Sequence, residues 1–147
     1  MKIAFDVGGV LSKYPEQFRE MIKALRSPTW CASSEVFVIS DMHPKEKIVE
    51  ILQLNDFYPL IPDANIYSAD YNAHGEGCKA ILLEELKIDM FFDDFIGYVV
   101  AGGAPIRLLV MPDAEKPYYA DSWKMPDGEP TFGRRMYTKK QAKGRDA

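Results

Sequence analysis

Cysteine is scarce in this sequence. Only Cys31 and Cys78 occur among 147 residues, far apart and outside any Cys-x-x-Cys pair. Their number and spacing indicate neither a disulfide framework nor a structural zinc site. Hydrophobic residues make up 47% and charged residues 27% of the chain, which is typical of a globular protein rather than a disordered or fibrous one. We therefore expect a folded domain with its own hydrophobic core, working in a reducing compartment.

Long uninterrupted hydrophobic runs are also missing. The longest apolar stretch, FIGYVVAGGAPIRLLVMP at 95–112, is broken by glycines, by Pro105 and by Arg107. A membrane-spanning helix needs about 20 consecutive apolar residues, which this stretch does not supply. Near the amino end, Asp6 interrupts the segment that would form the apolar region of a signal peptide, and no convincing cleavage pattern follows. These features predict a cytoplasmic protein with no membrane partner.

Positive charge gathers near the carboxyl end. The segment 134–147 holds six basic residues and one acid, a net of +5, although the whole chain carries −4. Such an end is usually a solvated segment, and it could instead contact phosphates electrostatically. We predict one domain at 1–133, with its core motifs within 1–112, followed by a basic, flexible tail at 134–147. Nucleic acid is a weakly supported partner of this tail.

Strand-like and helix-like patterns alternate along the chain. Apolar and β-branched runs predict strands at 3–5, 35–40, 65–71, 88–94 and 105–112. Helical spacing predicts amphipathic helices at 14–27, after Pro44, and from about Glu76 onward. The residues expected to face inward on these helices are Phe18, Met21, Ile22 and Leu25, then Ile48, Ile51 and Leu52, and finally Ile81, Leu82 and Leu86. This alternation predicts an α/β fold, a Rossmann-like parallel sheet with helices on both faces.

Polar residues end three of the predicted strands. They are Asp6, Ser40, and the pair Asp93 and Asp94. The carboxyl ends of parallel strands meet at one edge of a sheet, where α/β proteins bind ligands, so we expect these side chains to lie close together. Lys79 lies in the first turn of a predicted helix, where acids are more usual, and is therefore a candidate partner for an anion. The simpler interpretation of the first segment is a glycine-rich turn whose acid is only solvated.

Carboxylates that lie close together repel one another, and a divalent cation is a common means of keeping them ionised. Oxygen ligands with room for water suit magnesium, which often lies between carboxylates and a substrate phosphate. Ser40 and Lys79 would then hold phosphate oxygens. Asp6 would face the phosphorus atom as a nucleophile.

The order of these residues resembles that of the haloacid dehalogenase superfamily of phosphohydrolases. Four segments carry the resemblance: IAFDVGGVLS is similar to the nucleophile motif, VFVIS to the strand that ends in Ser or Thr, Lys79 to the conserved lysine of the family, and MFFDD to its acidic motif. The resemblance implies a catalytic Asp6 that forms an aspartyl-phosphate, with Lys79 beside it. It further implies Mg²⁺ held by Asp6, the backbone carbonyl of Gly8, Asp93 and Asp94, and substrate phosphate bound by Ser40, Lys79 and Gly9.

The spacing of the motifs leaves little room for insertions. The segment between Asp6 and Ser40 is largely used by one helix, and the segment between Ser40 and Lys79 by a helix and a strand. Neither holds a large cap domain, so the chain is similar to the small, capless members of the family. By analogy with those members, the site is open and admits a large phosphorylated substrate.

One position departs from the family pattern. Phosphatases of this family usually carry a second aspartate two positions after the nucleophile, and here that position is Gly8. General acid–base assistance contributes on the order of 10²–10⁴-fold to the rate of a reaction. Its loss implies slow turnover, or a replacement donor such as His43 or His74, or a protein that binds phosphate without hydrolysing it. We predict a magnesium-dependent phosphatase acting on a phosphomonoester; the alternative is a catalytically impaired module that binds phosphate and metal or regulates another protein.

Overall fold

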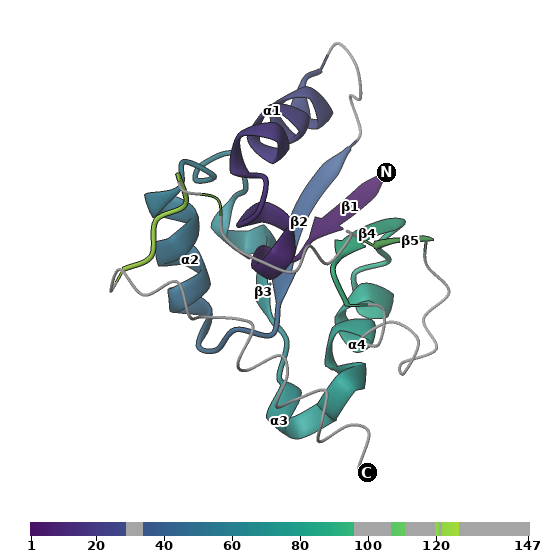
Figure 1. The fold of residues 1–147 in the computed structure, drawn as a ribbon. Coiled ribbons are helices and arrows are strands. Elements are labelled where there is room, and N and C mark those ends of the chain that lie inside the picture. Colours follow the sequence, from purple (N-terminus) through teal and green to yellow (C-terminus); the bar gives the residue numbers. More distant parts are fainter. Residues whose placement is uncertain (29–33, 96–106, 111–119, 121, 127–147) are drawn as a thin grey trace.

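Short strands alternate with helices along the chain (Figure 1). The computed structural model describes residues 1–28, 34–95, 107–110, 120 and 122–126. The described strands are β1 (Lys2–Phe5), β2 (Glu35–Ser40), β3 (Ile66–Ser68), β4 (Met90–Asp93) and β5 (Arg107–Val110). The helices are α1 (Pro15–Arg26), α2 (Lys45–Leu54), α3 (Tyr71–His74) and α4 (Cys78–Glu85). Shorter helical turns are η1 (Val7–Leu11), η2 (Asp63–Asn65) and η3 (Gly75–Gly77).

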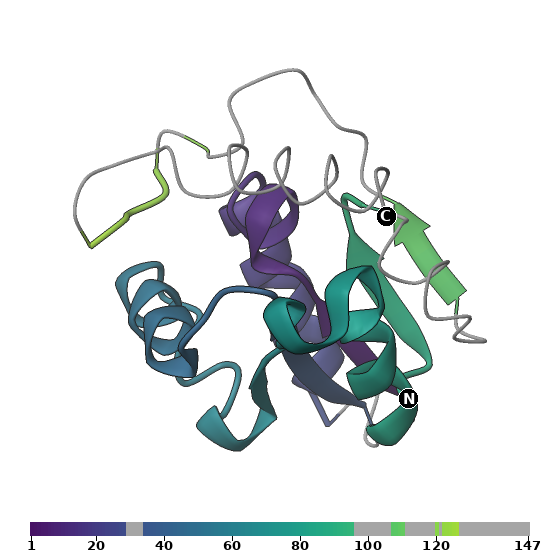
Figure 2. The same cartoon turned by 90° about the horizontal axis from the view of Figure 1, so that it is seen from below.

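The described strands form one parallel sheet in the order β3-β2-β1-β4-β5. β5, drawn in green, lies at one edge of this sheet (Figure 2). The chain adds strands outward from β1 to β3, then crosses back to place β4 on the other side of β1. Parallel α/β sheets bind ligands beyond the carboxyl ends of the strands where this reversal occurs, which here is between β1 and β4. The α/β fold with a parallel sheet is confirmed.

Side chains alternate between the two faces of the sheet. On β1, Ile3 and Phe5 belong to one buried cluster and Ala4 belongs to another. The first cluster includes buried residues of α1 and α2, and the second includes buried residues of α4. Helices therefore cover both faces, as the sequence predicts, and strands covered on both faces are apolar at nearly every position.

Helix α1 shows where the amphipathic pattern succeeds and where it fails. Pro15 occupies the first turn, where its missing N–H costs nothing. Phe18 and Ile22 are buried and Leu25 is partly buried against the same cluster. The inward placement of Met21 is wrong, because its side chain is 40% exposed. Met21 lies at the margin of the apolar stripe, where a flexible side chain can remain in contact with water.

Helix α4 is rotated differently from the prediction. Its buried residues are Cys78, Lys79, Ala80 and Leu83, whereas Ile81 is 39% exposed, so the inward placement of Ile81 is wrong. Leu82 and Leu86 are partly buried against the second cluster. The four consecutive apolar residues at 80–83 surround the helix rather than marking one face, so their pattern could not determine its rotation.

Part of the carboxyl-terminal region packs against α1 and α2. Trp123 is buried in the first cluster, with its ring centroid 5.9 Å from that of Phe57. The Asn55 side chain donates to the carbonyl of Lys124 and accepts from its backbone N–H, at 2.8 and 2.7 Å. These contacts hold residues 122–126 across the end of α2.

The basic tail predicted at 134–147 lies outside the described residues. Within the described residues, no helix has the length and apolar character needed to cross a membrane.

Candidate functional site

Asp6 follows β1 directly and lies at the point where the strand order reverses. The apolar residues of β1 are buried between the helix layers. Asp6 directly follows them and is also buried, with 1% of its surface exposed. Its backbone N–H donates to the carbonyl of Phe92 at 2.9 Å, which ties the end of β1 to β4. Oδ1 of Asp6 accepts a hydrogen bond from the Val7 N–H at 2.8 Å. The carboxylate is therefore held in one orientation at the sheet edge.

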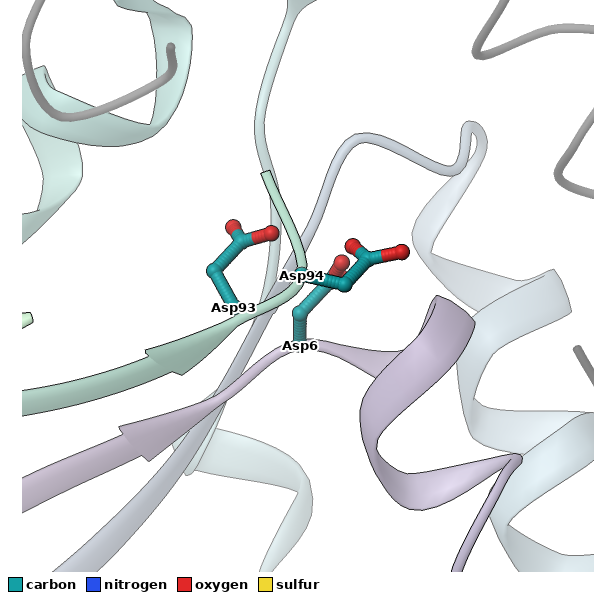
Figure 3. Close-up of side chains that lie close together, drawn as sticks. All are labelled: Asp6, Asp93 and Asp94. Atoms are coloured by element: carbon teal, nitrogen blue, oxygen red, sulfur yellow. The ribbon is translucent and has the colours of Figure 1, made fainter. Parts of the chain in front are cut away.

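Asp93 and Asp94 approach Asp6 from the neighbouring strand (Figure 3). Asp93 ends β4 and is fully buried, whereas Asp94 is half-buried just beyond the strand. One carboxylate oxygen from each of the three residues lies within 4.8 Å of the others. Oδ1 of Asp93 also accepts from the Phe95 N–H at 2.9 Å. The structure thus brings together all three carboxylates predicted to hold the metal.

Lys79 is the cation at the centre of this group. It has no exposed surface, and its Nζ lies 3.0 Å from Oδ2 of Asp6 and 2.9 Å from Oδ2 of Asp93. Helix α4 presents it to the face of the sheet from which both aspartates project. One ammonium therefore bridges the ends of β1 and β4.

Carboxylates outnumber ammonium groups among the described residues of this cluster. Asp6, Asp93 and Asp94 lie around the one buried ammonium of Lys79, where solvent is largely excluded. Burial raises the pKa of the Asp6 carboxyl well above its ordinary value of 3.8; Lys79 lowers it, and the nearby charges of Asp93 and Asp94 raise it further. A cation would offset this excess. The donor set consists of carboxylate oxygens, which suits a hard divalent ion such as Mg²⁺.

Gly9 and Gly8 differ in what they require of the backbone. Gly9 has φ +70°, and a Cβ atom there would overlap the carboxylate of Asp94. A side chain at Gly9 is therefore excluded both by conformation and by space. Gly8 has an ordinary φ of −67°, and a Cβ atom there would meet no described residue within 4 Å apart from its chain neighbours. The turn after β1 depends on Gly9, while the side-chain position at Gly8 is open.

The remaining predicted residues lie around this centre. Ser40 is buried at the end of β2, the strand beside β1, and its Oγ accepts from the Met42 N–H at 3.3 Å. His43 is exposed, with Nδ1 3.3 Å from Oγ of Ser68 at the end of β3, and His74 is exposed at the end of α3. The two histidines are thus placed on the outer side of the neighbouring elements rather than among the buried carboxylates.

Two residues of the surroundings were not predicted. Oγ of Ser12 accepts from the Gly9 N–H at 3.0 Å, and the Ser12 carbonyl accepts from the Ala120 N–H at 2.9 Å. Ser12 thereby fixes the glycine turn from within. The negative charge of Asp41 is one of the causes that raise the pKa of Asp6. Each had a local signal in the sequence, since Ser12 follows the turn by three residues and Asp41 directly follows Ser40.

Comparison with protein families, with curated proteins and with solved structures finds no significant match. The chemistry of the site must therefore be inferred from its own geometry. Three carboxylates that could hold a metal ion meet a buried ammonium at the edge of the sheet where α/β proteins bind ligands. Such a group is suited to transfer of an anionic phosphoryl group.

Proposed function

We propose that this protein is a magnesium-dependent phosphatase with a haloacid-dehalogenase-like site. The observation that carries the proposal is the buried Lys79 ammonium, which bridges Asp6 and Asp93 while Asp94 lies alongside. Burying charged side chains lowers the free energy of unfolding unless they are well paired. Binding of a metal ion and a phosphate would give this buried cluster a function.

Mg²⁺ would be held by Asp6, Asp93 and Asp94 together with the backbone carbonyl of Gly8. Bound there, the ion would neutralise the carboxylates and draw a substrate phosphate toward them. Phosphate oxygens would be bound by Ser40, Lys79 and Gly9, whose N–H would have to exchange its hydrogen bond to Oγ of Ser12 for one to the phosphate. Because Lys79 already orients Asp6 through its ion pair, the nucleophile needs no rearrangement before substrate binds.

The reaction would take place in two steps. A carboxylate oxygen of Asp6 forms a bond to phosphorus, the bond from phosphorus to the substrate oxygen breaks, and the leaving group takes up a proton. Water then attacks the phosphorus of the aspartyl-phosphate and gives up a proton, which releases inorganic phosphate and restores Asp6. Described segments between the site residues are short helices, turns and strands, which supports a site without a large cap domain.

A phosphate-binding module without turnover is the second candidate. It is favoured by Gly8, which has no side chain at the position where phosphatases of the family usually carry their second aspartate. Both candidates bind Mg²⁺, but only the enzyme releases phosphate. A panel of alkyl phosphates, p-nitrophenyl phosphate, phosphopeptides and 5′-phosphorylated oligonucleotides, assayed with Mg²⁺ and with a chelator, distinguishes them. We expect Mg²⁺-dependent phosphate release from at least one of these substrates.

Asp6→Asn tests the nucleophile, because an amide of nearly the same shape is a poor nucleophile. Asp56→Asn is a matched control. It makes the same charge change at an exposed position just after α2, and asparagine tolerates the positive φ of 60° there. We expect Asp6→Asn to abolish phosphate release and Asp56→Asn to leave it unchanged. Undiminished release by purified Asp6→Asn would exclude Asp6 as the nucleophile.

A further inference from the structure

The phosphatase chemistry proposed above requires a group that gives a proton to the leaving oxygen and later takes one from water. The side chains that meet at the buried centre do not supply it readily. Asp6 is committed to the attack, and Asp93 and Asp94 are the other proposed metal ligands. Lys79 is paired with two carboxylates, and Gly8 has no side chain. His43 and His74 are exposed on outer elements. A carboxyl group at the same sheet edge would be suited to both transfers.

We propose that Asp41 is this general acid and base. The inference rests on the proposed phosphatase function and assigns a further catalytic residue to that site. Its first support is the place of Asp41 in the fold. β1 and β2 pair in parallel up to Phe5 and Val38, and β2 ends at Ser40. Asp41 directly follows β2, at the edge of the sheet where Asp6 leads into the glycine turn.

The alternation of side chains places Asp41 toward the same layer as the nucleophile. On β2, Phe37 and Ile39 belong to the cluster on the α4 side of the sheet, and Asp41 is the next residue in that alternation. On β1, Ala4 belongs to the same cluster and Asp6 is the next residue in its own alternation. Lys79 meets Asp6 on the α4 side, and the alternation of β2, continued one residue past its end at Ser40, would place the Asp41 carboxyl on that same side.

The electrostatics agree with this placement. Burial is the main cause of the raised pKa of both Asp6 and Tyr71, and the charge of Asp41 raises both values further. Tyr71 begins α3 and packs against the cluster on the α4 side of the sheet, so the charge of Asp41 acts both on the end of β1 and on the start of α3. Asp41 is itself only half-buried, which leaves it accessible to a substrate and to water.

The open position at Gly8 completes the argument. Apart from its chain neighbours, no described residue lies within 4 Å of a Cβ atom built there. A substrate leaving group could occupy this space. In the first step the Asp41 carboxyl gives its proton to the departing oxygen as the phosphorus–oxygen bond breaks. In the second step the Asp41 carboxylate takes a proton from the water that attacks the aspartyl-phosphate, which returns Asp41 to its starting state.

The dependence on leaving group tests this role. An alkyl phosphate needs a proton on its departing oxygen, whereas p-nitrophenyl phosphate releases an anion that is already stable. For Asp41→Asn we expect the rate with the alkyl phosphate to fall by about 10²–10⁴-fold, and the rate with p-nitrophenyl phosphate to fall much less. Asp56→Asn, with the same charge change away from the site, should leave the ratio of the two rates unchanged.

A rescue experiment separates a chemical role from a structural one. Because Gly8 has an ordinary φ and open space, Gly8→Asp introduces a carboxyl group at the same edge of the sheet. Added to Asp41→Asn, it should restore part of the alkyl phosphatase activity. If Asp41→Asn does not fold, as judged by circular dichroism, Asp41→Ser undergoes the same comparison of substrates.

The outcomes separate the two proposals. Equal loss with both substrates, or no loss with either, would overturn the role of Asp41 while leaving the phosphatase intact. Absence of Mg²⁺-dependent phosphate release by the wild-type protein from either substrate would overturn the phosphatase proposal and, with it, this one. Selective loss with the alkyl phosphate together with rescue by Gly8→Asp is the result that supports Asp41.

Discussion

Removal of the buried ammonium is the most direct test of the energetics of the site. Lys79→Met keeps an unbranched side chain of similar length but takes away the charge that lies 3.0 Å from Asp6 and 2.9 Å from Asp93. Each carboxylate retains one backbone donor, Val7 for Asp6 and Phe95 for Asp93. The remaining negative charges then face each other without a cation between them.

The size of the effect follows from the distances. Carboxylate oxygens within 4.8 Å of one another repel by about 3 kcal/mol at an effective dielectric constant near 20. Breaking a buried ion pair by removing one partner typically costs about 3–5 kcal/mol, which agrees with this figure. Domains of ordinary size are stable by only about 5–15 kcal/mol, so the variant should lose a large share of its free energy of unfolding. A loss of this size lowers Tm by roughly 10–20 °C.

Urea unfolding at neutral pH in the presence of a chelator measures this loss. Lys45→Met is the matched control, because Lys45 pairs with Asp63 at 3.2 Å in an exposed salt bridge. Exposed pairs contribute about 0–1 kcal/mol, so the control should remain close to the wild type. Mg²⁺ should stabilise Lys79→Met more than the wild type, because the variant presents a more negative site to the ion. If the free energy of unfolding of Lys79→Met were less than about 1 kcal/mol below that of the wild type, the claim that Lys79 compensates a buried, charged pair would be refuted.

Further outcomes are expected at Gly8 and Gly9, at Asp6 and at Asn55. Gly9→Ala should weaken Mg²⁺ binding in calorimetric titration, because its Cβ would displace Asp94, whereas Gly8→Ala should bind Mg²⁺ like the wild type; equal affinity in the two variants would contradict the proposed crowding. The raised pKa of Asp6 means that the folded state binds a proton more tightly than the unfolded chain, so without metal its contribution to stability falls as pH rises from about 3.8 toward neutrality. Asp6→Asn should therefore show a smaller loss of unfolding free energy between pH 4 and pH 7 than the wild type, and equal slopes would show that Asp6 is not the cause. Asn55→Ala should lower the free energy of unfolding by about 3 kcal/mol, because three hydrogen bonds of a buried amide are lost, and a change below about 1 kcal/mol would contradict their contribution.

Local patterns in the sequence were sufficient to predict the elements of the sheet. Apolar runs predicted β1, β2, β4 and β5, and the described strands lie within or close to the predicted ranges. The periodicity of α1 identified Phe18 and Ile22 as core residues. These features are local consequences of side-chain alternation and helical spacing, so a single sequence carries them. The same patterns did not predict α3 or η3, because short turns leave little periodicity to detect.

The grouping of acids at one edge could also be expected from the sequence. Once the strands are taken as parallel, Asp6 and Asp93 end at the same edge for geometric reasons. The sequence did not say that β1 and β4 would be neighbours. That depends on which strands pair across long stretches of chain, and pairing is decided by the burial of both sheet faces together with the helices that cover them.

What the sequence alone determined is therefore the alternation of strands and helices, the parallel α/β class, and the residue types that end each strand. Only the tertiary structure decided the rotation of α4, which exposes Ile81 and buries Lys79 between two carboxylates. It likewise decided that Gly9 lies against Asp94 while the position at Gly8 stays open. The physical reason is that local patterns record which face of an element is apolar, whereas the partner of a buried charge is selected by packing and electrostatics across the whole fold.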